Sequence, residues 1–248
     1  MGLQVALVEQ APRILARVAP HPTAEALKAV HSQNGVDVIE GAHVESMERR
    51  ADGRVTGVLC RDSAGALRTL PADLVVVGIG GIPRDALARE CGLEVDNGIV
   101  VNDTGRTSDR SIWALGDVAR VRGSQVRLES VASANEQAAH VAAALVGQAP
   151  MAPGVPWFWS EQYDGRLQIA GLWNGSDRWV TRREAAGWSV WSFRGDRLQA
   201  VDAWQAPLAY ALGRQWLESG RTPDPSWLED QGNQLKEWNS QLVRECGK

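Results

Sequence analysis

Near its start the chain contains Leu3-Gln4-Val5-Ala6-Leu7-Val8-Glu9, a short apolar run that ends in a carboxylic acid. Such a run predicts a buried strand. The residues from Pro22 to Asn34 predict a helix, because proline is tolerated in a first helical turn, apolar residues recur on one face, and Gly35 suits the position after the last turn. Val36 to Ile39 predicts another strand. This order and spacing indicate the α/β alternation of a parallel sheet.

The strongest strand signal in the chain is Leu74-Val75-Val76-Val77-Gly78-Ile79-Gly80-Gly81. Its continuous β-branched run predicts a strand that is buried on both faces and ends in glycines. Before it, Val55 to Cys60 and Ala66 to Leu70 predict two strands joined by a turn. After it we expect a short helix at Arg84 to Cys91 and two short strands, at Ile99 to Asn102 and at Ser111 to Asp117. A long helix capped by Ser130 is expected at Val131 to Val146.

Tryptophan is distributed unevenly along the 248 residues. The chain has 11 Trp, and all except Trp113 lie between Trp157 and Trp238. This difference predicts separate structural units, with a Pro/Gly-rich connection at residues 147–154. Residues 155–204 predict an antiparallel meander, with strands at Leu167 to Trp173, Trp179 to Arg183, Trp188 to Phe193 and Leu198 to Ala203. Helices are expected at Leu208 to Ser219 and Leu228 to Arg244.

The side chains of this second half have mostly structural interpretations. Tryptophans at alternating strand positions predict core or sheet-face packing, and this applies to Trp173, Trp179, Trp188, Trp191 and Trp204. Arginines in the same strands predict a solvated face, with contact to an acidic partner protein as the alternative. These arginines are Arg178, Arg182 and Arg183.

The composition argues against several classes of protein. A net charge of −4 gives no reason to expect nucleic-acid binding, and no apolar run approaches the roughly 20 residues that cross a bilayer. The three cysteines, Cys60, Cys91 and Cys246, lie far apart, and the four histidines lack metal-ligand spacing. We therefore expect no metal site and no dithiol pair. Reduced thiols without a secretory signal predict a cytoplasmic protein.

Two candidate nucleotide contacts follow predicted strands, where α/β proteins bind nucleotides. Glu9 is placed to accept a hydrogen bond from the adenosine ribose of NAD, and its charge would repel the 2′-phosphate of NADP. Gly80, within the glycine-rich segment Gly78 to Pro83, would let the backbone approach a flat ligand closely. The simpler alternatives are a solvated strand end for Glu9 and a tight turn for the glycines.

A third candidate is the pair Gly116-Asp117 together with the helix expected to begin at Val131. The Asp117 carboxylate can accept a hydrogen bond from a sugar hydroxyl. The free N–H groups and positive dipole end of a helix N-terminus favour a reduced, anionic ring. The alternative is that Asp117 only caps a loop.

Three segments of the sequence resemble segments of a known protein family. The segment Thr107-Ser108-Asp109-Arg110-Ser111-Ile112-Trp113-Ala114-Leu115-Gly116-Asp117-Val118 resembles the second FAD motif of the flavoprotein reductases that have two dinucleotide-binding domains. Two further segments are similar to the ferredoxin and rubredoxin reductases of the putidaredoxin reductase type. They are Arg127-Leu128-Glu129-Ser130-Val131 and Val155-Pro156-Trp157-Phe158-Trp159-Ser160-Glu161-Gln162-Tyr163-Asp164. The resemblance covers nearly the whole chain.

The resemblance implies a fold and a division of the chain. The fold is α/β, with an incomplete Rossmann-type NAD domain and a segment of the FAD domain. An α+β C-terminal reductase domain follows, built from an antiparallel meander plus helices. The implied boundaries are residues 1–102 for the NAD part, 103–150 for the FAD segment and 151–248 for the reductase domain.

The resemblance also implies roles for individual residues. For FAD it implies that Asp117, beside Gly116, binds the ribitol, that the backbone at Val131 lies by the flavin ring, and that Trp159 packs near the isoalloxazine. For NAD it implies that Glu9 binds the ribose and that Gly80 passes the nicotinamide side. It implies no proton-transfer catalyst and no CxxC motif.

The implied reaction is hydride transfer from NADH to FAD, followed by single-electron transfer to a partner. That partner would be a [2Fe-2S] ferredoxin or a rubredoxin. The cofactors perform this chemistry, and the protein positions them. The implied cofactors are therefore FAD and NAD, while the oligomeric state is left open.

The chain departs from this family in one respect: the two glycine-rich pyrophosphate loops of the family do not occur in its sequence. We therefore expect Met1 to be an internal start, and the polypeptide alone to bind FAD and NAD poorly. The alternatives are a non-catalytic fragment that acts as an interaction module, or a subunit that requires a separate N-terminal chain.

Overall fold

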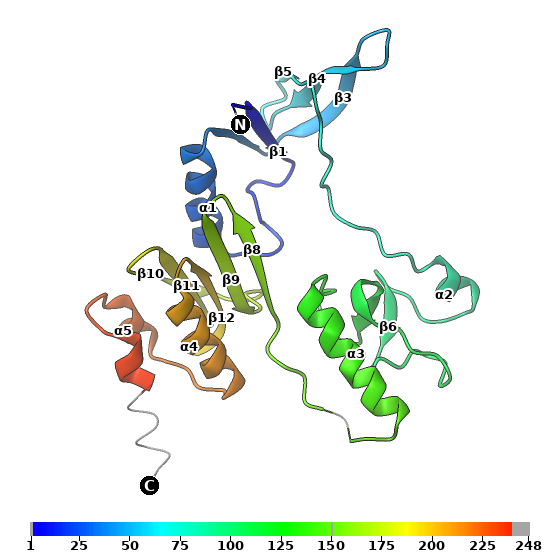
Figure 1. The fold of residues 1–248 in the computed structure, drawn as a ribbon, viewed down its shortest axis with the longest axis vertical. Coiled ribbons are helices and arrows are strands. Elements are labelled where there is room, and N and C mark those ends of the chain that lie inside the picture. Colours follow the sequence, from blue (N-terminus) through cyan, green and yellow to red (C-terminus); the bar gives the residue numbers. More distant parts are fainter. Residues whose placement is uncertain (1, 150, 240–248) are drawn as a thin grey trace. The chain divides into compact units, whose positions relative to one another are not determined.

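The computed structural model describes residues 2–149 and 151–239. Cys246 and the end of the helix expected at Leu228 to Arg244 lie outside these residues. The chain divides into two compact units, Met1–Ile79 and Gly80–Lys248, and each is described by itself (Figure 1).

The first unit begins with the expected strand, helix and strand. β1 (Val5–Glu9) pairs in parallel with β2 (Val36–Glu40), and α1 (His21–Gln33) connects them. The register places Val5 opposite Val36 and Glu9 opposite Glu40. Thr23, Ala24 and Leu27 form the buried face of α1, which packs against β2. The α/β alternation is thus confirmed.

A three-stranded antiparallel sheet follows, with β4 in the middle. Its strands are β3 (His43–Arg49), β4 (Val55–Arg61) and β5 (Leu67–Pro71). The sequence does not predict β3, because its residues lack a clear apolar alternation. In the structure every residue of β3 is exposed. Val58, Cys60 and Leu70 form a small buried cluster, and burial raises the pKa of the Cys60 thiol despite the nearby Arg68.

The strand expected at Leu74 to Gly81 is wrong. These residues form no strand in the structure, and the exposed fractions of Leu74, Val76 and Ile79 are 81%, 85% and 92%. Only Val75 packs, against the Val58 cluster. A β-branched run becomes a strand when neighbouring strands accept its hydrogen bonds and cover its faces, and the described residues supply no such neighbour.

The second unit begins with a segment of short elements. They are α2 (Ala86–Glu90), β6 (Ile99–Val101), the 3-10 turn η1 (Gly116–Val118), β7 (Ala119–Val121) and α3 (Val131–Leu145). β6 and β7 pair in parallel. As expected, Ser130 caps α3, since its Oγ accepts the N–H of Ser133 at 3.2 Å.

The strand expected at Ser111 to Asp117 is also wrong. Trp113 makes only an isolated bridge with Arg106, and the strand that does form starts two residues later, at Ala119. Gly116 has a φ of +76°, a left-handed conformation that an extended strand cannot contain. The Gly-Asp pair therefore lies in a turn that leads into β7.

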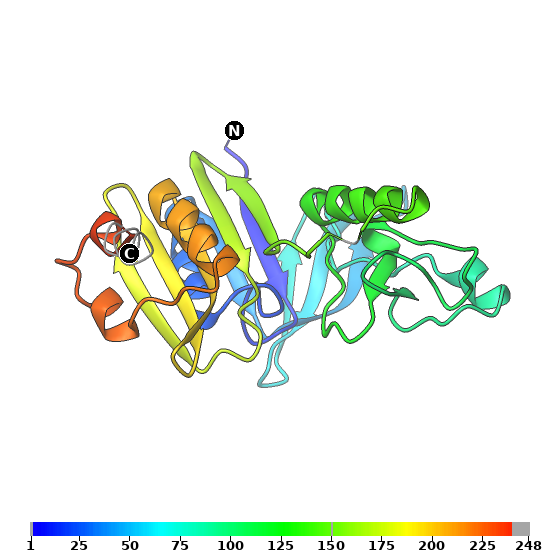
Figure 2. The same ribbon diagram turned by 90° about the horizontal axis from the view of Figure 1, so that it is seen from below.

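The C-terminal part is a five-stranded antiparallel sheet in the order β10-β11-β12-β9-β8. Its strands are β8 (Trp157–Gln162), β9 (Gly165–Gly171), β10 (Arg178–Arg183), β11 (Trp188–Arg194) and β12 (Arg197–Trp204). The helix α4 (Pro207–Glu218) packs on β12 and β9, and Figure 2 shows it lying along this sheet. The predicted antiparallel sheet is confirmed, with β8 as an additional strand, but β9 pairs with β12 and not with β10, so the order is not that of a simple meander.

Tryptophan dominates the core between this sheet and α4. Trp191 and Trp216 are fully buried, with ring centroids 5.3 Å apart, and such a pair contributes about 0.5–1.5 kcal/mol beyond its buried area. Trp204 is buried and stacks with Trp188 at 6.4 Å. The packing prediction is wrong for Trp179, whose exposed fraction is 38%.

The segment after α4 is held by a buried arginine. Arg182 was expected on a solvated face or against a partner, but only 4% of it is exposed. It donates hydrogen bonds to the backbone carbonyls of Leu228, Asp230 and Asn233, at 2.6 to 2.9 Å. The helix expected from Leu228 onward is interrupted: α5 covers Pro225–Glu229, a turn follows it, and residues 235–239 are helical again.

Among the described residues, no helix is long and apolar enough to cross a membrane.

Candidate functional site

The first unit carries one candidate contact, Glu9, at the end of β1. Glu9 is half-buried, and its Oε1 accepts the N–H of Ala11 at 2.8 Å. A cavity of about 580 Å³ lies at the ends of these strands, between Gln10, Glu40, His43 and the turn at residues 61–65. Glu9 itself does not line that cavity, whereas its neighbour Gln10 does.

Glu40 is the buried acid at this strand end. Its side chain is only 13% exposed, and it accepts hydrogen bonds from Lys28 Nζ and from the N–H of Ile14. Burial acts to raise the pKa of Glu40, but these two hydrogen bonds outweigh it, so the pKa lies below its usual value. Glu40 therefore stays ionised and fixes the loop between β1 and α1 to β2. Sequence reasoning did not single out Glu40, although it ends a strand as Glu9 does.

The second unit holds the Gly116-Asp117 turn against the start of α3. Gln137 Oε1 accepts the N–H of Gly116 at 2.8 Å, and Gln137 Nε2 donates to Ser133 Oγ at 3.0 Å. The same Ser133 donates its N–H to the cap residue Ser130. This chain of hydrogen bonds fixes the turn relative to the helix N-terminus, and the exposed Asp117 carboxylate has no bonding partner among the described residues.

Arg127 supports the other side of this turn. Its side chain is 6% exposed, Nη1 donates to the backbone carbonyl of Asp117, and Nη2 pairs with Glu129 at 2.6 Å. A Cβ on Gly98 would lie 2.8 Å from Arg127 Cδ, so a larger residue at position 98 would displace the Arg127 side chain. Sequence reasoning quoted Arg127 and Glu129 within a family segment but gave neither a role.

The glycine-rich segment lies beside this arginine–glutamate pair. A Cβ built on Gly81 would be 3.7 Å from Glu129 Oε1, and the adjoining Gly80 is exposed with a φ of +97°. The second unit therefore gathers three sequence-predicted residues, Gly80, Gly116 and Asp117, around Arg127 and Glu129.

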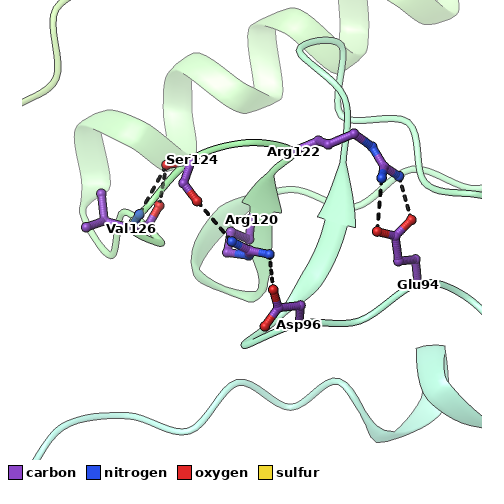
Figure 3. A network of polar contacts seen from close by, with 6 residues as sticks. All are labelled: Glu94, Asp96, Arg120, Arg122, Ser124 and Val126. Atoms are coloured by element: carbon purple, nitrogen blue, oxygen red, sulfur yellow. Dashed lines mark hydrogen bonds and ion pairs between the residues drawn. The ribbon is translucent and has the colours of Figure 1, made fainter.

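Ion pairs join β7 and the residue after it to the segment before β6 (Figure 3). Arg122 donates both Nη atoms to the Glu94 carboxylate, at 3.0 and 2.6 Å, and this hydrogen bonding holds the pKa of Glu94 below its usual value. Arg120 pairs with Asp96 and also donates to the carbonyl of Ser124 at 2.9 Å. The loop that leads from β7 to Arg127 is thereby fixed to the segment before β6.

Trp159 lies on β8 and presents an aromatic face. Its exposed fraction is 39%, and it stacks on Trp157 with ring centroids 5.5 Å apart. The chain before β8 is joined to α3 by a hydrogen bond from the N–H of Gly154 to Glu136 Oε1 at 2.6 Å. The described contacts do not join Trp159 directly to Asp117. Val131, the first residue of α3, is exposed.

The donor set fits part of a flavin. The free Asp117 carboxylate suits a ribityl hydroxyl, the capped start of α3 supplies N–H groups, and Trp159 offers an apolar face. No loop in the sequence has the G-x-G-x-x-G pattern that binds a pyrophosphate. The residues therefore fit the ribityl and ring portions of FAD and leave the pyrophosphate to other groups.

Comparison with known proteins shows the family. Residues 1–138 match the family model described as pyridine nucleotide-disulphide oxidoreductase, and residues 157–239 match the one described as reductase C-terminal. Putidaredoxin reductase from Pseudomonas putida is 40% identical over 243 residues, which are 95% of this chain and 57% of the relative. Rubredoxin-NAD(+) reductase from Pseudomonas putida is 36% identical over 84% of this chain and 54% of its own length.

A solved structure shows the same fold. The covalent putidaredoxin reductase–putidaredoxin complex superposes with a TM-score of 0.87 at 41% identity, covering 96% of this chain and 58% of the reductase. The chain thus spans somewhat more than half the length of the relatives it matches. It belongs to the pyridine nucleotide-disulphide oxidoreductase family, in the branch of the putidaredoxin, ferredoxin and rubredoxin reductases.

Proposed function

We propose that this chain forms part of an NADH-dependent flavoprotein reductase that passes electrons through FAD to a [2Fe-2S] ferredoxin or a rubredoxin. The observation that carries the proposal is the Gly116-Asp117 turn, fixed by Gln137 on one side and Arg127 on the other. This turn leaves a free carboxylate beside a capped helix start. FAD, when bound, supplies the chemistry of accepting a hydride and releasing single electrons.

The residues of the chain bind and orient in this proposal, and none transfers a proton. Asp117 accepts a hydrogen bond from a ribityl hydroxyl, and the N–H groups at Val131 favour negative charge on the reduced ring. Trp159 covers an apolar ring face and excludes water from it. The Gly80 backbone leaves space on the nicotinamide side, because no side chain projects there.

The preference for NADH comes from Glu9. A carboxylate at a strand end accepts hydrogen bonds from the adenosine ribose, and it repels the 2′-phosphate that distinguishes NADPH. The cavity beside Gln10 and Glu40 adds space at the same strand ends, lined by a second acid. Glu40 is paired with Lys28, so the discrimination against NADPH rests on Glu9.

The acceptor is proposed from the relatives. One related reductase was crystallised in a covalent complex with putidaredoxin, and another is named as a rubredoxin reductase. Both names describe small one-electron carriers. A cytoplasmic location is part of the same proposal, because three widely separated cysteines are typical of a compartment that keeps thiols reduced.

The experiment is an FAD titration followed by flavin fluorescence and absorbance. It compares the wild-type chain with Asp117→Asn and with the matched control Asp103→Asn, another exposed acid of the second unit. Losing the charged acceptor should weaken FAD binding about tenfold, while the control binds as the wild type does. NADH should then bleach the bound flavin. Equal affinities for the two variants would refute the site.

A second candidate is a fragment that works only together with a separate polypeptide. It is favoured by the exposed apolar segment after β5. In that case the chain alone binds FAD weakly, and full activity needs the partner.

A further inference from the structure

Two acids end the neighbouring strands β1 and β2, and their environments differ. Glu9 and Glu40 lie opposite each other in the parallel register. Oε1 of Glu9 accepts the N–H of Ala11, and the part of the chain that the structure describes supplies no partner for its Oε2. Glu40 is more deeply buried, and both of its oxygens have partners, namely Lys28 and the N–H of Ile14. One acid is therefore available to a ligand, whereas the other is committed to the fold.

The loop between β1 and α1 connects these two acids. Glu40 accepts the N–H of Ile14 at 2.8 Å, and Ile14 is itself buried. The N–H of Gly41, the residue after Glu40, donates to the carbonyl of Ala11 at 2.9 Å. The N–H of Ala11 in turn donates to Oε1 of Glu9 at 2.8 Å. The middle of the loop is thus tied to β2, and its start is tied to the Glu9 side chain.

The backbone of this loop needs such support. Leu15 has a φ of +55°, a left-handed conformation that is unfavourable for a residue with a Cβ and that persists only where surrounding contacts fix it. Arg13 provides part of the support, because its guanidinium donates to the carbonyls of Ile14 and Ala19. The contact of Ile14 with Glu40 joins the same stretch to the sheet. Without that contact the loop would relax, and Ala11 would no longer hold the Glu9 carboxylate.

We propose that Glu40 is a positioning residue that sets the preference for NADH over NADPH by holding Glu9 through the β1–α1 loop. The inference rests on the proposed function for the role of Glu9 at the adenosine ribose. With the loop in place, Ala11 fixes one oxygen of Glu9 and leaves the other for a ribose hydroxyl. A 2′-phosphate then meets a carboxylate that cannot turn away. Lys28 offsets the charge of Glu40, so that this second acid adds little repulsion of its own.

Two other roles for Glu40 lead to different expectations. If Glu40 only stabilised the first unit, its removal would weaken NADH and NADPH binding by the same factor, because both ligands need the folded unit. If Glu40 touched the dinucleotide directly from the cavity that it lines beside Gln10, its effect would add to that of Glu9. A residue that acts through Glu9 changes the ratio of the two dissociation constants, and it does so only while Glu9 is present.

The first measurement is the dissociation constant of NADH and of NADPH for the full chain, by ligand-observed NMR titration, which also detects weak binding. Glu40→Met keeps the length of the side chain and removes the acceptor of the Ile14 N–H, whereas Glu40→Gln keeps an acceptor oxygen. The preference for NADH should fall about tenfold in Glu40→Met and in Glu9→Gln, and stay within about twofold of the wild type in Glu40→Gln. The matched control is Glu48→Met, at an exposed acid of β3.

The second measurement needs no nucleotide. Amide hydrogen exchange at Ala11 and Ile14 should accelerate about tenfold in Glu40→Met, because both N–H groups lose their fixed acceptors. Exchange of the α1 amides reports whether the first unit stays folded, and it should match that of Glu48→Met. Glu40→Gln should restore slow exchange at Ala11.

The double variant Glu9→Gln/Glu40→Met separates the roles. It should show the same preference as Glu9→Gln alone. A further fall would overturn the proposal in favour of direct contact, and an unchanged preference in Glu40→Met, or equal losses for both nucleotides, would overturn it as well. If Glu9→Gln keeps the wild-type preference, or the wild type binds neither nucleotide, the role of Glu9 in the proposed function is refuted. Accelerated exchange at Ala11 would then still establish the link between the two acids.

Discussion

Gln137 and Gly116 lie 21 residues apart, and the side chain of one accepts the backbone N–H of the other at 2.8 Å. This single contact decides the position of Asp117, which is the next residue. It connects the second turn of α3 to a glycine whose positive φ would otherwise leave the turn free to rearrange.

Replacing Gln137 with alanine should loosen the turn without unfolding the unit. The substitution removes two neutral hydrogen bonds, with Gly116 and with Ser133, and each contributes about 0.5–1.5 kcal/mol. Amide exchange at residues 116–118 should accelerate, and FAD affinity should fall. The control is Gln148→Ala, an exposed glutamine after α3. Unchanged exchange at Gly116 would show that the contact does not hold the turn.

Arg127→Ala should destabilise the second unit more strongly. The substitution removes a buried cation that donates to the Asp117 carbonyl, and it leaves Glu129 without its pair. Hydrogen bonds to charged groups contribute about 1.5–3 kcal/mol. Urea unfolding followed by tryptophan fluorescence measures this unit, and Arg110→Ala is the exposed control. A midpoint equal to that of the control would contradict the structural role.

Stability at low pH should depend on Glu40. Its pKa in the folded chain lies below the ordinary value of 4.5, so the stability that it contributes is present above about pH 4.5 and is lost as the pH falls through the folded pKa. Glu40→Gln should make the free energy of unfolding of the first unit depend less on pH in the acid range. Residues 1–79 contain no tryptophan, so hydrogen exchange of α1 and β2 is the measurement. Glu45→Gln, which removes an exposed pair with Arg61, should keep the wild-type slope.

Gly165→Ala should disrupt the C-terminal sheet. The added Cβ would lie 1.9 Å from the Trp204 ring, a distance that forces the indole or the backbone to move. Overpacking of this kind costs about 1–3 kcal/mol. Thermal unfolding of the second unit should show it, whereas Gly81→Ala places its Cβ at an ordinary 3.7 Å from Glu129 and should leave the transition in place.

Trp159 and Trp179 offer a matched pair for detecting the flavin. They are 39% and 38% exposed, and they lie on opposite edge strands of one sheet. If Trp159 faces the flavin, Trp159→Phe should remove most of the tryptophan quenching that FAD causes, and Trp179→Phe should not. Equal quenching in both variants would place the flavin elsewhere.

The sequence predicted elements whose signals are local. The helix α3 was found because Ser130 and the alanine-rich pattern need only their own hydrogen bonds, and β9 to β12 were found because turns separate alternating residues. The strand predicted at Leu74 to Gly81 failed for the opposite reason. The β-branched residues of this segment predict a strand, but a strand forms only beside neighbouring strands, and the described residues supply none.

The residues of the candidate site could be chosen from the sequence, but the residues that support them could not. Asp117 and Gly116 stand in a recognisable motif, whereas Gln137 is one polar residue on a helix and nothing nearby in the sequence points to Gly116. Arg182 shows the same limit. Its charge predicts exposure, and only the fold brings three carbonyls from distant residues to bury it.

Those three carbonyls have a consequence for how the segment after α4 can change. Because Arg182 contacts only the backbone of Leu228, Asp230 and Asn233, the contact depends on the path of the chain and not on the identity of the last two side chains. The side chains of Asp230 and Asn233 act on the turn itself, since Asp230 accepts the N–H of Gly232 and Asn233 donates to the carbonyl of Trp227, so substitutions that keep these hydrogen bonds should be tolerated. Inserting or deleting one residue between 228 and 233 would move these carbonyl acceptors and leave the buried Arg182 guanidinium without hydrogen-bond partners. The length of this connection, more than its composition, is therefore what the fold preserves.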